Sequence, residues 1–182
     1  MAFIPPYRVT NEILTSLTAI AEARAEILRA KILPQAELRL QRQALARMTH
    51  SSTMIEGNAL NLAQVEHVLD GKKIEALSRD IYEVENYLRA MRSIEEAARQ
   101  GAKITERLIL RIHGLLMDRT LPKEQCGAWR NKPVYVVRKE DGKKDEVVYT
   151  GPPAVTVPDL MKDFVGWLEE SKKEDVHPIL VA

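Results

Sequence analysis

The sequence of 182 residues has few of the features that mark secreted and membrane proteins. Its single cysteine, Cys126, has no partner for a disulfide within the chain. No apolar run approaches the roughly 20 residues that a helix needs to cross a bilayer. Residues 1–6 lack the charged and apolar segments of a secretory signal. We therefore expect a soluble protein of the reducing cytoplasm that does not span a membrane.

The chain also lacks an excess of charge of either sign. Its 27 Lys and Arg residues are balanced by 26 Asp and Glu residues, which leaves a formal net charge of +1. This balance gives no long-range attraction toward nucleic acid or anionic lipid, and a DNA-binding helical domain is disfavoured. With 45% hydrophobic residues, the chain has enough apolar side chains to bury a sizeable core.

Several common signatures of catalysis and metal binding are missing too. The four histidines at 50, 67, 113 and 177 form no His-x-x-x-His pair, so we expect no metal site. The sequence has neither a Gly-rich phosphate loop nor a Gly-x-Ser-x-Gly elbow. His113 lies beside apolar positions of a predicted helix, where a hydrogen-bonded core or boundary histidine is favoured over a catalytic one.

Apolar residues recur at helical spacing along most of the chain. Thr10 and Asn11 offer an N-cap for a long amphipathic helix, and Pro34 separates it from a second helix expected to end near His50. A short helical piece over 51–56 is closed by a glycine. Later helices are predicted to begin at Asn61 with a capping box, at Ser78 or Asp80, at Thr105 and at Val157-Pro158.

The pattern becomes extended after residue 133, where two β-branched and aromatic runs flank a polar loop that contains Asp141-Gly142. This pattern predicts a β-hairpin over 133–150 in an otherwise helical fold. A two-stranded ribbon leaves an edge with free backbone groups, to which a partner segment can add as a strand. The candidate docking residues are Val134, Tyr135, Val136, Val147, Val148 and Tyr149. The alternative is a structural hairpin that packs on helices.

The end of the sequence predicts a helix that is cut short. Pro178 suits the first position of a new helix, yet the sequence stops after one further turn. One turn does not offset the cost of helix nucleation by itself. We therefore expect more polypeptide after Ala182, either as a deleted continuation or as a separate chain.

The most specific local feature is the segment 52–58. Ser52 and Glu56 lie one turn apart on the same face of the predicted helix. Glu56 stands in the last turn before Gly57, where its charge opposes the negative end of the helix dipole at a cost of about 0.3–1 kcal/mol. A cationic partner supplied from elsewhere would remove that cost. An ordinary surface glutamate beside a helix cap is the alternative.

Ser52 to Gly57 resembles a known motif, Ser/Thr-x-x-x-Glu-Gly/Asn, in the inhibitory helix of the Fic family of AMP-transferring enzymes. Segments 111–117 and 127–130 are similar to those that precede the flap of that family, and the hairpin follows where the flap is expected. Segments 151–153 and 157–161 resemble the flap exit and the next helix. The similarity runs from about Pro34 to Ala182 and implies a mainly α, all-helical bundle of the Fic type with one β-hairpin.

The family signature His-Pro-Phe-x-Asp/Glu-Gly-Asn-Gly-Arg-x-x-Arg does not occur in these residues, and His177-Pro178 resembles the start of the helix that precedes it. In the family, the signature histidine takes a proton from the target hydroxyl that attacks the α-phosphate of ATP. The acidic residue of the signature holds Mg²⁺, and its glycines and arginines cradle the phosphates. The resemblance thus implies ATP and Mg²⁺ as cofactors of the intact protein, but no catalytic residue in this chain, which we expect to be inactive alone.

What the chain does hold, according to the resemblance, is a switch. Glu56, with Ser52 and Gly57, would pair with the last arginine of the signature in the place of the γ-phosphate, so that ATP binds only unproductively. The hairpin would hold a protein target and set one Ser, Thr or Tyr hydroxyl over the nucleotide. Arg130 is either a phosphate or carboxylate contact or an arginine that packs or stacks beside Trp129.

Two functional interpretations remain. The leading one divides the chain into an N-terminal helical region, 1–100, with an inhibitory helix at about 50–57, and the first part of a Fic core, 101–182, with the flap hairpin at 133–150. This chain would be the regulatory and target-docking part of a self-inhibited protein adenylyltransferase, and its partners would be a target protein and the missing C-terminal Fic segment. The alternative is a non-enzymatic helical module that binds a protein through the hairpin edge.

Overall fold

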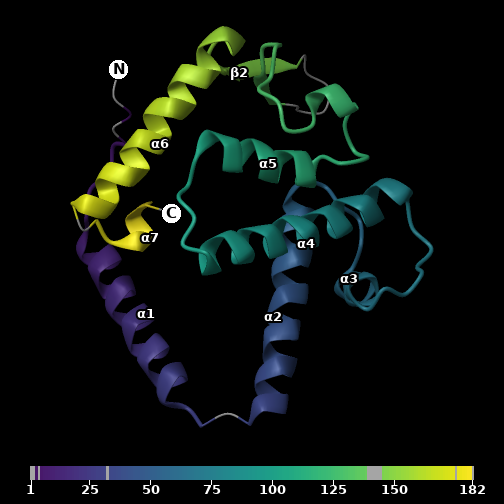
Figure 1. The fold of residues 1–182 in the computed structure, drawn as a ribbon, viewed down its shortest axis with the longest axis vertical. Helices are drawn as coiled ribbons and strands as arrows, with labels where there is room; N and C mark the ends of the chain where they lie inside the picture. The colour runs from purple at the N-terminus through teal and green to yellow at the C-terminus, as the bar shows by residue number, and fades with distance from the viewer. Residues whose placement is uncertain (1–2, 4, 32, 139–144, 175, 182) are drawn as a thin grey trace.

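The computed structural model describes residues 3, 5–31, 33–138, 145–174 and 176–181, which form helices and one hairpin (Figure 1). The helices are α1 (Asn11–Arg29), α2 (Pro34–Ile55), α3 (Leu62–Leu69), α4 (Ser78–Arg99), α5 (Glu106–Leu116), α6 (Val157–Lys173) and α7 (Pro178–Val181). The strands β1 (Tyr135–Arg138) and β2 (Glu146–Thr150) are antiparallel, and the short 3-10 helices η1 (Lys123–Gln125) and η2 (Ala154–Thr156) flank them in sequence. The predicted mainly α fold with one β-hairpin is confirmed.

The helix starts follow local capping chemistry. Side-chain oxygens accept hydrogen bonds from first-turn amides at three predicted N-caps, Thr10, Asn61 and Thr105. The prediction for α4 is wrong, because neither Ser78 nor Asp80 caps it. Leu77 occupies the N-cap position without a side-chain hydrogen bond, and Asp80 is already inside the helix and buried.

The end of α2 also differs from the prediction. We expected one helix ending near His50 and a separate piece over 51–56, whereas the structure has a single helix that runs through to Ile55. Neither proline nor glycine stands between residues 35 and 56, so nothing in the backbone interrupts the helical hydrogen bonds. The predicted inhibitory segment is therefore the last part of α2.

A Schellman motif closes α2. Gly57 has a left-handed backbone with a φ of +90°, which glycine adopts without steric cost. The amide of Gly57 donates to the carbonyl of Met54 at 3.0 Å, and the amide of Asn58 donates to that of Thr53 at 3.1 Å. Glu56 is thereby fixed as the C-cap residue of the helix.

The core lies where α2, α3 and α4 meet. Its buried apolar residues are Leu60, Val65, Val84 and Leu88. On another face, α4 packs along α5, and the two helices lie side by side across the centre of Figure 1. Asn86 of α4 is fully buried and donates hydrogen bonds to the carbonyls of Leu116 and Asp118, which ties the end of α5 to α4.

The helix α1 lies outside this core. No residue of α1 is buried, and Figure 1 shows α1 and α2 diverging from the segment that joins them. The other end of α1 lies near α6 and α7, where Phe3 makes edge contacts with Phe164 and Trp167 at ring-centroid distances of 5.2 and 5.3 Å. Among the described helices, none combines the length and the apolar character needed to cross a membrane.

The hairpin likewise stands apart from the core, and every described strand residue is exposed. Val136 pairs with Tyr149, and the register shifts between Val136 and Val137. Such a bulge increases the local twist of a ribbon. The predicted turn at Asp141-Gly142 lies outside the described residues.

Candidate functional site

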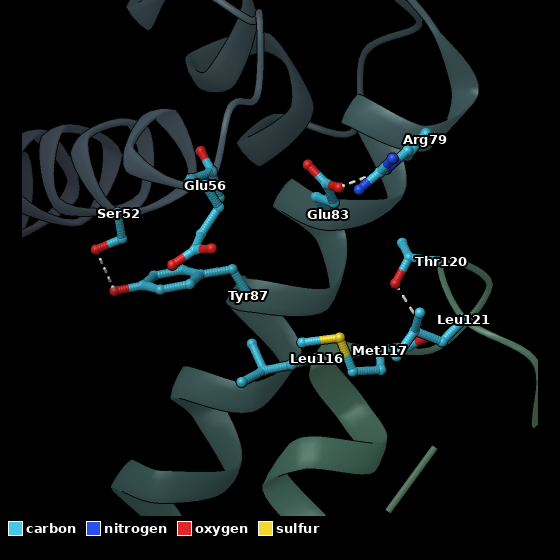
Figure 2. A pocket seen from close by; sticks show the side chains of 10 residues that line it. Ser52, Glu56, Arg79, Glu83, Tyr87, Leu116, Met117, Thr120 and Leu121 are labelled. Atoms are coloured by element: carbon cyan, nitrogen blue, oxygen red, sulfur yellow. Dashed lines mark hydrogen bonds and ion pairs between the residues drawn. The ribbon is translucent and has the colours of Figure 1, made fainter. Parts of the chain in front are cut away.

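A groove of about 460 Å³ lies between the end of α2, the first half of α4 and the end of α5 (Figure 2). Its lining side chains are Ser52, Thr53, Glu56, Arg79, Glu83, Tyr87, Leu116, Met117, Thr120 and Leu121. The structure therefore brings Ser52 and Glu56, which we singled out from their spacing, to one groove. Gly57, the third predicted residue, shapes the backbone next to the groove without lining it.

The carboxylate of Glu56 has no ionic partner within the part of the chain that the structure describes. No hydrogen bond or ion pair to this carboxylate occurs among the described residues. The last turn of α2 contains no basic residue either, so nothing local offsets the negative end of the helix dipole. Figure 2 shows the Glu56 side chain reaching from the end of α2 toward the ring of Tyr87.

The second acidic residue of the groove, Glu83, is already paired. One of its carboxylate oxygens accepts a hydrogen bond from Nε of Arg79, and the other accepts one from Nδ2 of Asn58, both at 2.9 Å. Arg79 is the one cation among the residues that line the groove. With Glu56 and Glu83 against Arg79, the lining carries a formal charge of −1 and favours a cation.

These residues do not fit a nucleotide triphosphate or its metal ion. The single lining cation is neutralised by Glu83, so no positive charge is left for phosphate oxygens. No group of three or more His, Cys, Asp or Glu side chains that could hold a metal ion occurs in the described parts of the chain. The floor formed by Leu116, Met117 and Leu121 instead suits the apolar stem of a long cationic side chain.

The six predicted docking residues of the hairpin are all exposed in the structure. Their side chains are 43–59% exposed in the free chain, and none lines the groove at Glu56. Large apolar side chains gathered on an exposed ribbon are typical of an interaction site. The alternative of a hairpin packed on helices is not what the described strands show.

Arg130 closes the base of the hairpin. Its guanidinium donates to the carbonyl of Lys132 at 2.8 Å and to that of Pro152, and so joins the entry of the ribbon to its exit. From the sequence we considered a phosphate or carboxylate contact, or packing beside Trp129. The contact with two backbone carbonyls differs from both. His113 is half-buried and accepts a hydrogen bond from the amide of Gly127 at 3.0 Å, which confirms a hydrogen-bonded boundary histidine.

Comparisons with known proteins agree on one family, although no family model matches the chain. The chain is 30% identical over 174 residues to "Protein adenylyltransferase Fic" of Drosophila grimshawi and equally so to that of Drosophila virilis. Each match covers 90% of this chain and 30% of the relative. A crystal structure of a Fic family protein from Desulfovibrio desulfuricans G20 matches 98% of this chain and 50% of that chain, with 31% identity and a TM-score of 0.77.

The chain belongs to the Fic family. The similarity to the bacterial structure confirms the expected Fic-type helical architecture with its hairpin. This Fic-family chain spans about 30% of the length of the curated relatives that it matches.

Two residues that contact the predicted switch were missed by sequence reasoning. Asn58 is 5% exposed and bonds to α4, and Tyr87 lies with its hydroxyl 3.1 Å from that of Ser52. Asn58 had one local signal, because it directly follows the glycine that ends the helix. Tyr87 had none, since 35 residues separate it from Ser52.

Proposed function

We propose that this Fic-family chain is the regulatory and target-docking part of a self-inhibited cytoplasmic enzyme that transfers AMP from ATP to a Ser, Thr or Tyr hydroxyl of a protein. The names of the Drosophila relatives support the reaction class. The catalytic signature of the family is not found in these 182 residues. In this proposal the chain is inactive alone, and the Mg²⁺ and ATP sites of the intact enzyme are formed by a C-terminal Fic segment.

The unpaired carboxylate of Glu56 carries the proposal. It stands beside an apolar floor, in a groove with a net negative charge, at a helix end that disfavours a lone anion. An arginine from the C-terminal segment would remove that unfavourable charge and form a charge-assisted pair with the carboxylate. While engaged in this way, the arginine is withheld from the γ-phosphate of ATP, and this is the proposed inhibition.

The hairpin supports the docking half of the proposal. Both strands are exposed, and valines and tyrosines project from a ribbon whose edges have free backbone groups. Strand addition uses backbone hydrogen bonds for affinity and side-chain contacts for register. A target segment held in one register would present one hydroxyl at a fixed place.

The inhibitory half is tested by Glu56→Gly in the full-length protein. Loss of a charge-assisted pair corresponds to about 1.5–3 kcal/mol, so AMP transfer from α-labelled ATP should rise about 10- to 100-fold. Glu75→Gly, which removes an exposed glutamate outside the groove, is the matched control and should leave the rate unchanged. Equal rates for the wild type and Glu56→Gly would reject self-inhibition by this residue.

The docking half is tested in the activated Glu56→Gly background. Val136→Asp places a charge on the exposed hairpin, and Val155→Asp, at an 84% exposed position outside the strands, is the control. Labelling of other proteins should fall with Val136→Asp alone, while the KM for ATP stays the same. If the full-length protein transfers no AMP but retains partners that depend on Val136, the non-enzymatic interaction module is the correct function.

A further inference from the structure

The Glu56 carboxylate is flanked in sequence by two hydrogen-bonded contacts with α4. One turn before it, the hydroxyls of Ser52 and Tyr87 lie 3.1 Å apart. Two residues after it, the side chain of Asn58 bonds to the first turns of α4. Figure 2 shows Glu56 and Ser52 on the α2 side of the groove, with Tyr87 and Glu83 facing them from α4.

The Asn58 contact is buried and uses both ends of the amide. Nδ2 donates to the carbonyl of Asp80 at 3.0 Å and to Oε2 of Glu83 at 2.9 Å. Oδ1 accepts a hydrogen bond from the amide of Leu60 at 3.1 Å. Because Asn58 is 5% exposed, water does not readily replace these partners.

The Tyr87 contact comes from the same helix face as Glu83. The two residues are four apart on α4, so their side chains are neighbours on its surface. One face of α4 therefore contacts α2 before Glu56, through Ser52, and the segment that follows α2, through Asn58. In the last turn of α2, Thr53 is buried at 7% exposed, whereas the final residues Met54 and Ile55 are 53% and 80% exposed.

From this arrangement we infer that Tyr87 and Asn58 are positioning residues of the switch, which hold the end of α2 on α4 and so aim Glu56 into the groove. They act through Glu56, because the exposed final residues Met54 and Ile55 fray when the side-chain contacts on either side of them are lost. This inference rests on the proposed function, and it identifies the contacts that keep Glu56 in its inhibitory position.

The first test measures AMP transfer by the full-length protein. Tyr87→Phe should raise the rate about two- to tenfold, the factor that corresponds to one neutral hydrogen bond. Asn58→Ala, which removes three hydrogen bonds, should raise it more, and neither variant should exceed Glu56→Gly. In the Glu56→Gly background neither substitution should add a further increase. Tyr82→Phe, which removes another tyrosine hydroxyl of α4, is the matched control and should have no effect.

The second test measures amide hydrogen exchange in the same proteins. Asn58→Ala should speed exchange at the amides of Gly57 and Asn58, which close the end of α2, and leave the amides of α5 unchanged. Unchanged exchange at the end of α2 would overturn the inference, because the helix end would then be held by other contacts.

The outcomes separate this inference from the proposal beneath it. If Glu56→Gly activates the enzyme but Tyr87→Phe and Asn58→Ala do not, the positioning role is wrong and self-inhibition stands. If the positioning variants still increase the rate in the Glu56→Gly background, they act elsewhere and the inference is overturned. If Glu56→Gly itself changes nothing, the proposed function fails first.

Discussion

The helices α1 and α4 are similar in length, 19 and 22 residues, but they differ in how they are packed. Five residues of α4 are buried, and this helix contacts α2, α3 and α5. No residue of α1 is buried, and four of its large apolar side chains are between 49% and 75% exposed. Both helices have an apolar stripe, so amphipathic character alone does not decide which of them is buried.

This difference in packing makes α4 important both for the stability of the fold and for the candidate site. Burial of apolar area is the main source of folding free energy, so the interfaces of α4 should dominate the stability of this chain. The same helix holds the end of α2 at Glu56. Large apolar side chains are exposed on α1, on α2 and on the hairpin.

The largest expected difference between α4 and α1 is in the free energy of unfolding that is lost when a leucine side chain is truncated. Leu88→Ala in α4 removes a side chain that is 6% exposed and should lower the free energy of unfolding by about 2–5 kcal/mol. Leu28→Ala in α1, where the side chain is 75% exposed, should change it by less than about 0.5 kcal/mol. Urea unfolding followed by circular dichroism measures both. A comparable loss for Leu28→Ala would mean that α1 is packed in solution.

A smaller difference is expected for buried and exposed asparagines on the two helices. Asn86→Ala in α4 leaves the carbonyls of Leu116 and Asp118 without their donor and should cost about 1–3 kcal/mol. Asn11→Ala at the exposed start of α1 should cost less than about 0.5 kcal/mol. The stability of both variants is measured from the midpoint of urea unfolding. Equal midpoints for the two variants would contradict the expected difference in packing between α4 and α1.

Helix caps sharpen the comparison further, because a cap contributes about 1 kcal/mol wherever it stands. Thr105→Ala uncaps α5, which packs on α4, so the loss should appear in global unfolding. Thr10→Ala uncaps α1, and the loss should appear instead as faster amide exchange within α1, with the global midpoint unchanged. A shifted global midpoint for Thr10→Ala would show that α1 unfolds together with the core.

The smallest effect is a pH dependence at the joint between α4 and α5. The hydrogen bond from Arg89 lowers the pKa of Asp118 below its usual value of 3.8, and the charges of Arg89 and Arg119 act in the same direction. A lowered folded-state pKa means that this stability is present above pH 3.8 and is lost as the pH falls through the folded value. Asp118→Asn should therefore destabilise slightly at pH 7 and not below the folded pKa.

The control variant is Glu26→Gln, which removes an exposed carboxylate of α1 outside this ion-pair network. Thermal unfolding at pH 7 and at a series of pH values that decreases from 3.8 measures both variants. A constant difference between Asp118→Asn and the wild type across this range would contradict the proposed ion pair.

Much of the fold was predictable, because its signals are local. The caps at Thr10, Asn61 and Thr105 and the hairpin runs were recognised and confirmed. The break predicted within α2 was wrong, since the apolar pattern weakened there while no residue stopped the helix. At the candidate site, the spacing of Ser52 and Glu56 placed them on one groove, but the partners on α4 carried no local signal.

The sequence by itself determined where most of the helices and both strands begin, because caps, glycines and side-chain periods act within a few residues. It also determined the family resemblance and the position of Glu56 at a helix end. Only the tertiary structure decided that α4 is buried while α1 is not, and that Tyr87 and Asn58 hold the segment around Glu56. Packing joins residues far apart in the chain, and no short pattern encodes which apolar face meets which.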